Sequence, residues 1–284
     1  MFKSLNYMRV FTLFFSVLLT CSIMAQDVKM RKEGAINVEV SYRMEQLCDY
    51  PNQWRNSDWR EEFTLMLELS DGQAHSYVVE EQRTLLSALA QFQQENRWHL
   101  EAGPIAHLGE TFIKGKTLEQ LVNLDAAGVY RYTESVPKLN WKVCDEKKKV
   151  LDYDCQRATC SFRGRDYEAW FTEDIPMSYG PWKFSGLPGL ILEVSDTKNE
   201  YHFTATGIER PKEQKQIKIP DESFIRPIKR ERALKMEALL HKDHGAFAAD
   251  YGITFTLEGM EHIVGGSNSW ISGFFSSFIA VELP

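Results

Sequence analysis

The sequence predicts a mainly β protein of the α+β class, an antiparallel meander or open half-barrel with one or two packed helices. Apolar and polar side chains alternate from Val38 to Met44 and again from Phe63 to Leu69, which is typical of half-buried strands. Asp71-Gly72, directly after the second segment, is a strong hairpin signal. Further short β-prone segments follow at close intervals, and apolar residues recur at helical spacing in two segments.

The first 25 residues have the pattern of a secretory signal peptide. Lys3 and Arg9 precede a short apolar run, and small residues lead to Ala25, after which we expect cleavage. The run is too short to span a membrane. A lipoprotein box ending at Cys21 is the alternative, although the threonine before it fits poorly. We therefore expect export across the inner membrane, to the periplasm or the outer membrane, and a single mature domain over 26–284 with a helical elaboration near 228–244.

The charge of the chain argues against nucleic acid as a partner. The formal net charge is −7, and removal of the leader takes Lys3 and Arg9 with it, leaving −9. An acidic surface disfavours nucleic acid and anionic lipid. Two basic clusters occur nonetheless: Lys147–Lys149 is predicted to be a solvated hairpin tip, and Arg226–Arg232 the polar face of a helix. No later segment is long and apolar enough to cross a membrane.

The remaining elements follow from the same two periodicities. Thr84 to Asn96 carries leucines at helical spacing and is predicted to lie as a helix against the sheet. The segment 212–218 is predicted to be a polar linker. Further strands are expected at 77–79, 111–113, 129–133, 139–143, 150–155, 158–162, 167–171, 190–194, 201–205, 253–257 and 278–283.

The loop between the first two strands carries aromatic side chains. Tyr50, Trp54 and Trp59 stand among polar residues there. They could form a binding surface, but folding back onto the sheet edge is the favoured interpretation.

The second predicted helix lies near the C-terminus. Ala233 and Leu240 lie on one face, and Gly245 ends the helix. His241 and His244 suit its C-terminal dipole. They could instead offer two metal nitrogens, but the glutamate of the zincin pattern is missing between them.

The most constrained stretch is Ser178–Leu192, centred on Gly186-Leu187-Pro188-Gly189-Leu190-Ile191. Two glycines and a proline fix a turn that leads directly into a β-prone run. This hexapeptide, with Tyr153–Thr159, Phe162–Arg165 and Ala169–Pro176 upstream, resembles the GLPGLI family of secreted Bacteroidetes-type proteins, whose biochemical role is unsettled. The resemblance implies a secreted protein, and the partner that it suggests is an outer-membrane transport or envelope protein. It supplies no catalytic residue.

The same stretch is the predicted interaction site. The aromatic and apolar residues around a rigid turn could hold an apolar ligand or a peptide. Alternatively, these residues close one end of the core and contact nothing else. The candidate residues are Tyr179, Trp182, Phe184, Gly186, Leu187, Pro188, Gly189 and Leu190.

Four cysteines remain after the leader: Cys48, Cys144, Cys155 and Cys160. In an exported protein they favour disulfides, and three pairings are possible. Cys144 and Cys155 flank a charged segment, so a bridge across a hairpin there is plausible. A zinc site is less well supported because no second close pair of ligands completes it.

The sequence shows no catalytic motif. A Gly-x-Ser-x-Gly elbow is absent, and Glu173 and Asp174, as neighbours in a strand, would point to opposite faces. We therefore expect no cofactor or metal and favour an exported binding or accessory module. The alternative is a secreted hydrolase whose site is not visible in the sequence.

Overall fold

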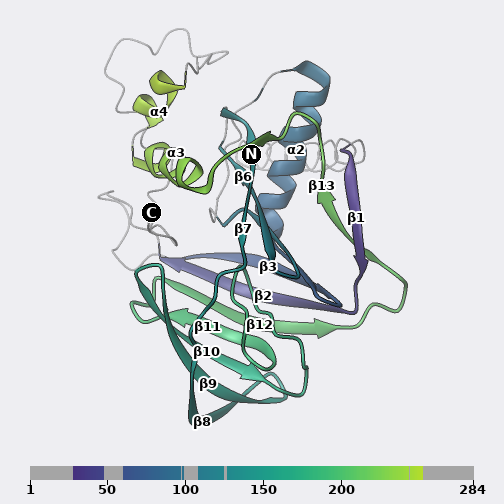
Figure 1. The fold of residues 1–284 in the computed structure, drawn as a ribbon, viewed down its shortest axis with the longest axis vertical. Coiled ribbons are helices and arrows are strands. Elements are labelled where there is room, and N and C mark those ends of the chain that lie inside the picture. The colour runs from purple at the N-terminus through teal and green to yellow at the C-terminus, as the bar shows by residue number, and fades with distance from the viewer. Residues whose placement is uncertain are drawn as a thin grey trace, which may run out of the picture.

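The computed structural model describes residues 28–47, 60–96, 98, 108–124, 127–242 and 244–251 (Figure 1). One sheet holds 12 strands in the order β14-β7-β6-β5-β4-β3-β2-β12-β11-β10-β9-β8, and a second holds β1 and β13. Neighbouring strands pair in the antiparallel sense, except that β14 is parallel to β7. Among the described residues, β14 and β8 are the two edges, so this sheet is open. The predicted class, a mainly β protein with an open antiparallel meander, is confirmed.

The bounds of the strands agree with most of the predicted segments. The large sheet consists of β2 (Val38–Leu47), β3 (Arg60–Ser70), β4 (Gln73–Val78), β5 (Glu110–Lys114), β6 (Thr117–Asn123), β7 (Val129–Ser135), β8 (Lys142–Val150), β9 (Tyr153–Phe162), β10 (Arg165–Thr172), β11 (Leu190–Asp196), β12 (Tyr201–Glu209) and β14 (Arg226–Pro227).

The main core depends on a pairing between distant parts of the chain. β2 pairs with β3 as a neighbour in sequence and with β12 from far along the chain, with Met44 opposite Phe203. The alternating residues of β2 and β3, among them Tyr42 and Leu67, are fully buried in this core. The alternation seen in the sequence therefore marks the buried face of the sheet correctly.

The first described helix, α2 (Val79–Glu95), begins earlier than predicted. The strand expected to reach Val79 ends at Val78, and Glu80 and Glu81 lie in the first helical turn, where acidic side chains suit the helix dipole. Asn96 ends the helix in the left-handed conformation, at φ 53°.

A two-stranded ribbon, which the sequence did not reveal, lies apart from the large sheet. It consists of β1 (Met30–Ala35) and β13 (Gln216–Pro220), and the second strand falls in the segment predicted to be a polar linker. Only two apolar residues, Ile217 and Ile219, alternate there, and both are buried in a second core with Leu85 and Leu89 of α2.

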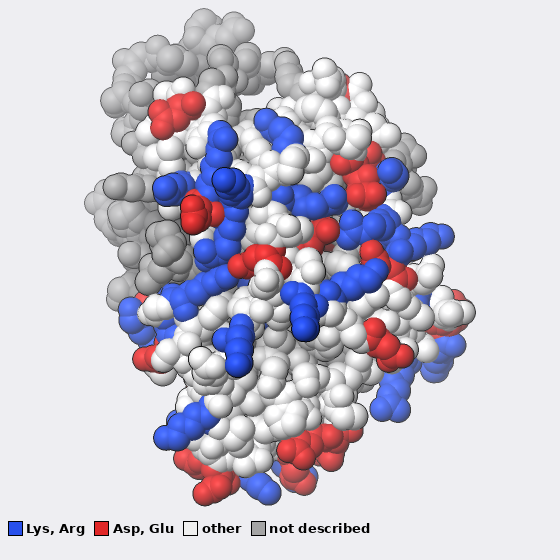
Figure 2. Space-filling model, viewed as in Figure 1, with Lys and Arg blue, Asp and Glu red and all other residues white. Residues whose placement is uncertain are grey.

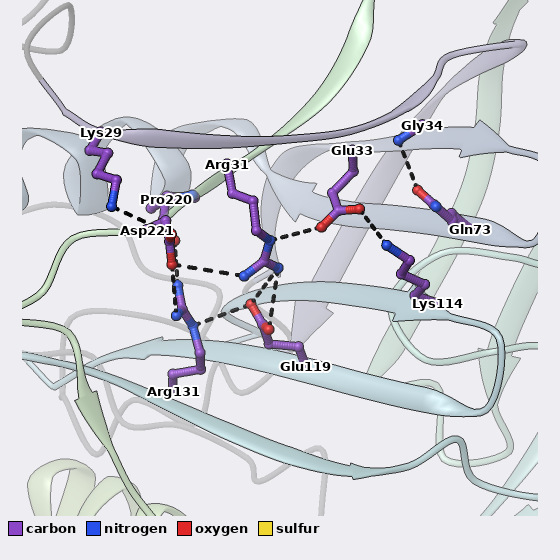
Figure 3. Close-up of polar contacts among 10 residues, drawn as sticks. All are labelled: Lys29, Arg31, Glu33, Gly34, Gln73, Lys114, Glu119, Arg131, Pro220 and Asp221. Atoms are coloured by element: carbon purple, nitrogen blue, oxygen red, sulfur yellow. Dashed lines mark hydrogen bonds and ion pairs between the residues drawn. The ribbon is translucent and has the colours of Figure 1, made fainter.

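Ion pairs attach this ribbon to the large sheet, and Figure 3 shows its side chains pointing toward β5, β6 and β7. Arg31 contacts Glu119 at 3.2 Å, and Arg131 contacts the same carboxylate at 3.2 Å and Asp221 at 3.2 Å. Glu33 accepts a hydrogen bond from Lys114 at 2.8 Å. The network joins β1 to three strands that are distant in sequence.

The basic run Lys147–Lys149 is not a hairpin tip. It lies within β8, and the turn follows at 151–152. β8 is an edge strand, and most of its residues are exposed. Lysines are common on such strands because their charge opposes pairing with another chain.

The C-terminal part contains α3 (Arg230–Lys242) and α4 (His244–Asp250), where one helix was predicted. Ala233 and Leu240 are buried, as their spacing indicated. Several predictions lie outside the described residues. They are the leader, the aromatic loop with Cys48, the strands at 253–257 and 278–283, and the roles of the His241 and His244 side chains. None of the described helices is long and apolar enough to cross a membrane.

Candidate functional site

The predicted interaction stretch forms a plug between β10 and β11, which we define as residues 178–189. It reaches across the sheet to β4, where the Trp182 backbone N–H donates to Ser76 Oγ at 2.9 Å. Trp141 Nε1 donates to the Ser185 carbonyl at 2.9 Å. The Phe184 ring lies 4.9 Å from that of Tyr167. The plug is therefore held by strands from both halves of the sheet.

The two glycines of the hexapeptide have different tasks. Gly186 has φ +95°, a conformation that favours glycine. Gly189 is required by close approach, because a Cβ atom there would lie 1.9 Å from the Thr172 carbonyl oxygen. Together they turn the chain so that Leu190 continues directly into β11 beside Thr172.

Most of the candidate site residues belong to the main core. Trp182 is 4% exposed, and Phe184, Leu187 and Leu190 are at most 1% exposed. Gly189 is buried, Tyr179 is half-buried, and Gly186 and Pro188 are exposed. The structure thus brings these residues together as the end of a core, and contact between a ligand and the buried ones would require the plug to move. Their role in ligand binding stays a prediction.

The plug also carries a buried lysine that the sequence reasoning missed. Lys183 is 2% exposed, and its Nζ donates to the Tyr132 hydroxyl at 3.0 Å. The same nitrogen lies 3.6 Å from the carboxylate of Glu134, which also accepts a hydrogen bond from Arg163 at 2.6 Å. A buried ammonium needs such partners. Nothing in the local spacing pointed to this contact, because Lys183 stands between two core aromatics and its partners are about 50 residues away.

A second buried polar group lies on the opposite face of the sheet, where β3, β4 and β5 adjoin. His75, which is 1% exposed, contacts Glu68 through Nδ1 at 2.9 Å and Glu110 through Nε2 at 2.6 Å. Tyr77 donates to the other oxygen of Glu68 at 3.2 Å. Burial alone would lower the pKa of His75, but the charges of Glu110 and Glu68 and their hydrogen bonds outweigh it and raise the pKa to about 9.

This group is suited to stabilising the sheet by electrostatic attraction. An imidazolium between two carboxylates binds three adjacent strands to one another. Because the ring is almost completely buried, a substrate cannot reach it without displacing the structure above. The sequence contained a partial signal, since Glu68 and His75 face each other across the hairpin at Asp71-Gly72.

The predicted disulfides are not found among the described cysteines. Cys144, Cys155 and Cys160 are free. The reason is the register of β8 and β9, which places Lys148, not Cys144, opposite Cys155. Cys155 and Cys160 are buried, and burial raises the pKa of the Cys155 thiol to about 11 and that of Cys160 to about 12.

The remaining predictions concern carboxylates and metals. Glu173 and Asp174 are exposed and lie in the turn after β10, which ends at Thr172, and not in a strand as assumed. Within the described ranges, no group of three or more histidine, cysteine, aspartate or glutamate side chains is arranged to hold a metal ion.

Comparison with known proteins identifies the family. Residues 69–229, more than half of the chain, match the family described as "N-glycanase peptide, N-terminal domain". The chain belongs to this family. The match covers the plug, His75 and Lys183. It overturns the predicted membership of the GLPGLI family: the hexapeptide is explained by the turn geometry above and does not identify that family.

Two solved structures are similar to this member of the N-terminal domain family. They are "Structure of PNGF-II in P21 space group", with a TM-score of 0.46 and 17% identity, and "Structure of PNGF-II in C2 space group", with a TM-score of 0.45 and 16% identity. The similar regions cover 71% and 72% of this chain and 33% of the PNGF-II chain in each case. The chain therefore spans about a third of the length of these proteins. No curated protein matches the chain.

Proposed function

We propose that this chain serves in the hydrolysis of N-linked glycans, as a domain of an N-glycanase. The observation that carries the proposal is the family match over residues 69–229. It favours the secreted hydrolase over the binding or accessory module. The matched family is the N-terminal domain of an N-glycanase, which is why we assign the chain to a domain of such an enzyme.

The buried group around His75 supports the fold of this domain. Among the described carboxylates, Glu68 and Glu110 lie closest to a histidine, a side chain that can carry a proton. Both contact His75, at 2.9 and 2.6 Å. A general acid or base must be within reach of the substrate. This group is withdrawn from solvent, so it stabilises the sheet and is out of reach of a substrate. Export and an outer-membrane partner remain predictions of the sequence.

The test uses the full chain and one N-glycosylated peptide, with the same peptide lacking the glycan as the control. Glycan release is followed by mass spectrometry and affinity by titration calorimetry in the same preparation. We expect an interaction that depends on the glycan, seen as release or as binding at least tenfold tighter than that of the control peptide. Equal affinity for both peptides together with no release would refute the proposal.

A further inference from the structure

Three aromatic side chains meet at the surface where α2 ends. The ring of Phe92 lies 4.3 Å from that of Trp98 and 4.7 Å from that of Phe224, and the rings of Trp98 and Phe224 are 5.9 Å apart. All three remain partly exposed, whereas Leu85 and Leu89, earlier on α2, are buried. Trp98 and Phe224 pack against the same core as the leucines, and the parts of the rings that the core does not cover are in contact with solvent.

One basic side chain, Arg226, adjoins this surface. Arg226 is exposed, and its guanidinium lies 4.4 Å from the centre of the Tyr130 ring and donates to the Ala127 carbonyl. Trp98 and Arg226 both pack against Gly128: a Cβ atom there would lie 2.6 Å from the indole and 2.7 Å from the guanidinium. The glycine thus allows an aromatic and a cationic side chain to lie next to each other.

The local charge is opposite to that of the whole chain. The segment 226–232 carries Arg226, Lys229, Arg230 and Arg232 and a single acid, Glu231, in a chain of net charge −7. Lys229 and Arg232 are exposed. Figure 2 shows lysine and arginine side chains gathered over the region of α3 and the neighbouring strands. Such a local field attracts anions although the protein as a whole repels them.

We propose that this aromatic-basic surface, formed by Phe92, Trp98, Phe224, Arg226 and Arg232, binds an acidic sugar of an N-linked glycan. The apolar face of a pyranose ring packs on an aromatic ring, and a guanidinium donates two parallel hydrogen bonds to a carboxylate. Arginine suits this task better than lysine because its donors are planar and fixed. The inference rests on the proposed function, and it specifies the substrate as glycans that carry a carboxylate.

Another ligand combines aromatic stacking with negative charge, namely single-stranded nucleic acid. The net charge of −7 disfavours a long polyanion, whereas a single carboxylate needs only the local cations. The acidic sugar is therefore the favoured occupant, and nucleic acid is one outcome of the test.

The experiment titrates the full chain with an N-glycopeptide ending in sialic acid and with the same glycopeptide after removal of that sugar. We expect the sialylated form to bind at least tenfold tighter. Arg226→Gln should abolish this preference, and Trp98→Ala should weaken the binding of both forms. Because Arg226 also holds the Ala127 carbonyl, Arg232→Gln is the second variant, and it should reduce the preference several-fold without changing the melting temperature. Lys212→Gln, an exposed lysine outside the surface, is the matched control and should change nothing.

The outcomes separate this inference from the proposed function. Equal binding of both glycopeptides, or a preference that survives Arg226→Gln and Arg232→Gln, would overturn the acidic-sugar site while leaving N-glycan hydrolysis in place. A single-stranded oligonucleotide that binds tighter than the sialylated glycopeptide would overturn it in favour of nucleic acid. If neither glycopeptide binds or is cleaved, both proposals fail.

Discussion

Replacing Gly189 with alanine adds one methyl group and should strongly lower the stability of the protein. The Cβ atom of Gly189→Ala would lie 1.9 Å from the Thr172 oxygen and 2.6 Å from the Thr172 carbonyl carbon, where real Cβ contacts essentially never fall below 3.0 Å. The two backbones must therefore separate by about 1 Å, and Thr172 cannot rotate away because it pairs with Leu190 in the sheet. Overpacking of this kind costs about 1–3 kcal/mol, and we expect the upper end, about 3 kcal/mol.

The assay is urea unfolding of the full chain, with thermal unfolding as a second measure. A loss of about 3 kcal/mol corresponds to a drop of roughly 6–12 °C in melting temperature for a domain of this size. Gly207→Ala is the matched control, since a Cβ atom there would meet nothing within 4 Å, and it should be neutral or slightly stabilising. If Gly189→Ala lost no more stability than Gly207→Ala, the close-approach explanation of the hexapeptide would be refuted.

Three further predictions use the same unfolding assay or a labelling measurement. The pKa of His75 is about 9 in the folded protein and 6.5 when unfolded, so the protonated ring stabilises the fold fully below about pH 6.5. A few kcal/mol of unfolding free energy should be lost as the pH rises through 9. H75Q, measured across the same range, should lack this pH dependence. Glu119→Gln removes the carboxylate shared by Arg31 and Arg131 and should lower the free energy of unfolding by about 1 kcal/mol. Salt at 1 M should diminish this loss, and a loss that salt leaves unchanged would contradict the ionic assignment. Iodoacetamide at pH 8 should label Cys144 well before Cys155, whose thiol is buried with a pKa of about 11, and equal labelling rates would show that β9 opens readily.

Periodicity predicted the parts of the fold that bury one face of a strand. Val38 to Met44 and Phe63 to Leu69 alternate over several residues, and both segments are strands with the expected face in the core. β13 failed the same test because it is short and only Ile217 and Ile219 mark it among polar residues. Its burial depends on α2, and no local pattern contains that information.

The chemistry of the chain was less predictable than its fold. The hexapeptide was correctly recognised as a rigid turn, but its apolar residues gave no indication that Lys183 would reach β7. Likewise, the partners of His75 come from β3 and β5, and only the β3 partner could be found from a hairpin register. Sites assembled from several strands become visible only when the order of the strands in the sheet is known.

The plug also determines when this protein can complete its fold. Ser76 receives its hydrogen bond from Trp182, 106 residues later, and β2 finds its second neighbour only in β12. The apolar faces of β2, β3 and β4 stay exposed to solvent until the plug and β12 pack on them. Contacts so distant in sequence slow folding and leave apolar surface open to aggregation. This domain should therefore stay prone to aggregation until residue 209, the end of β12, is available to fold.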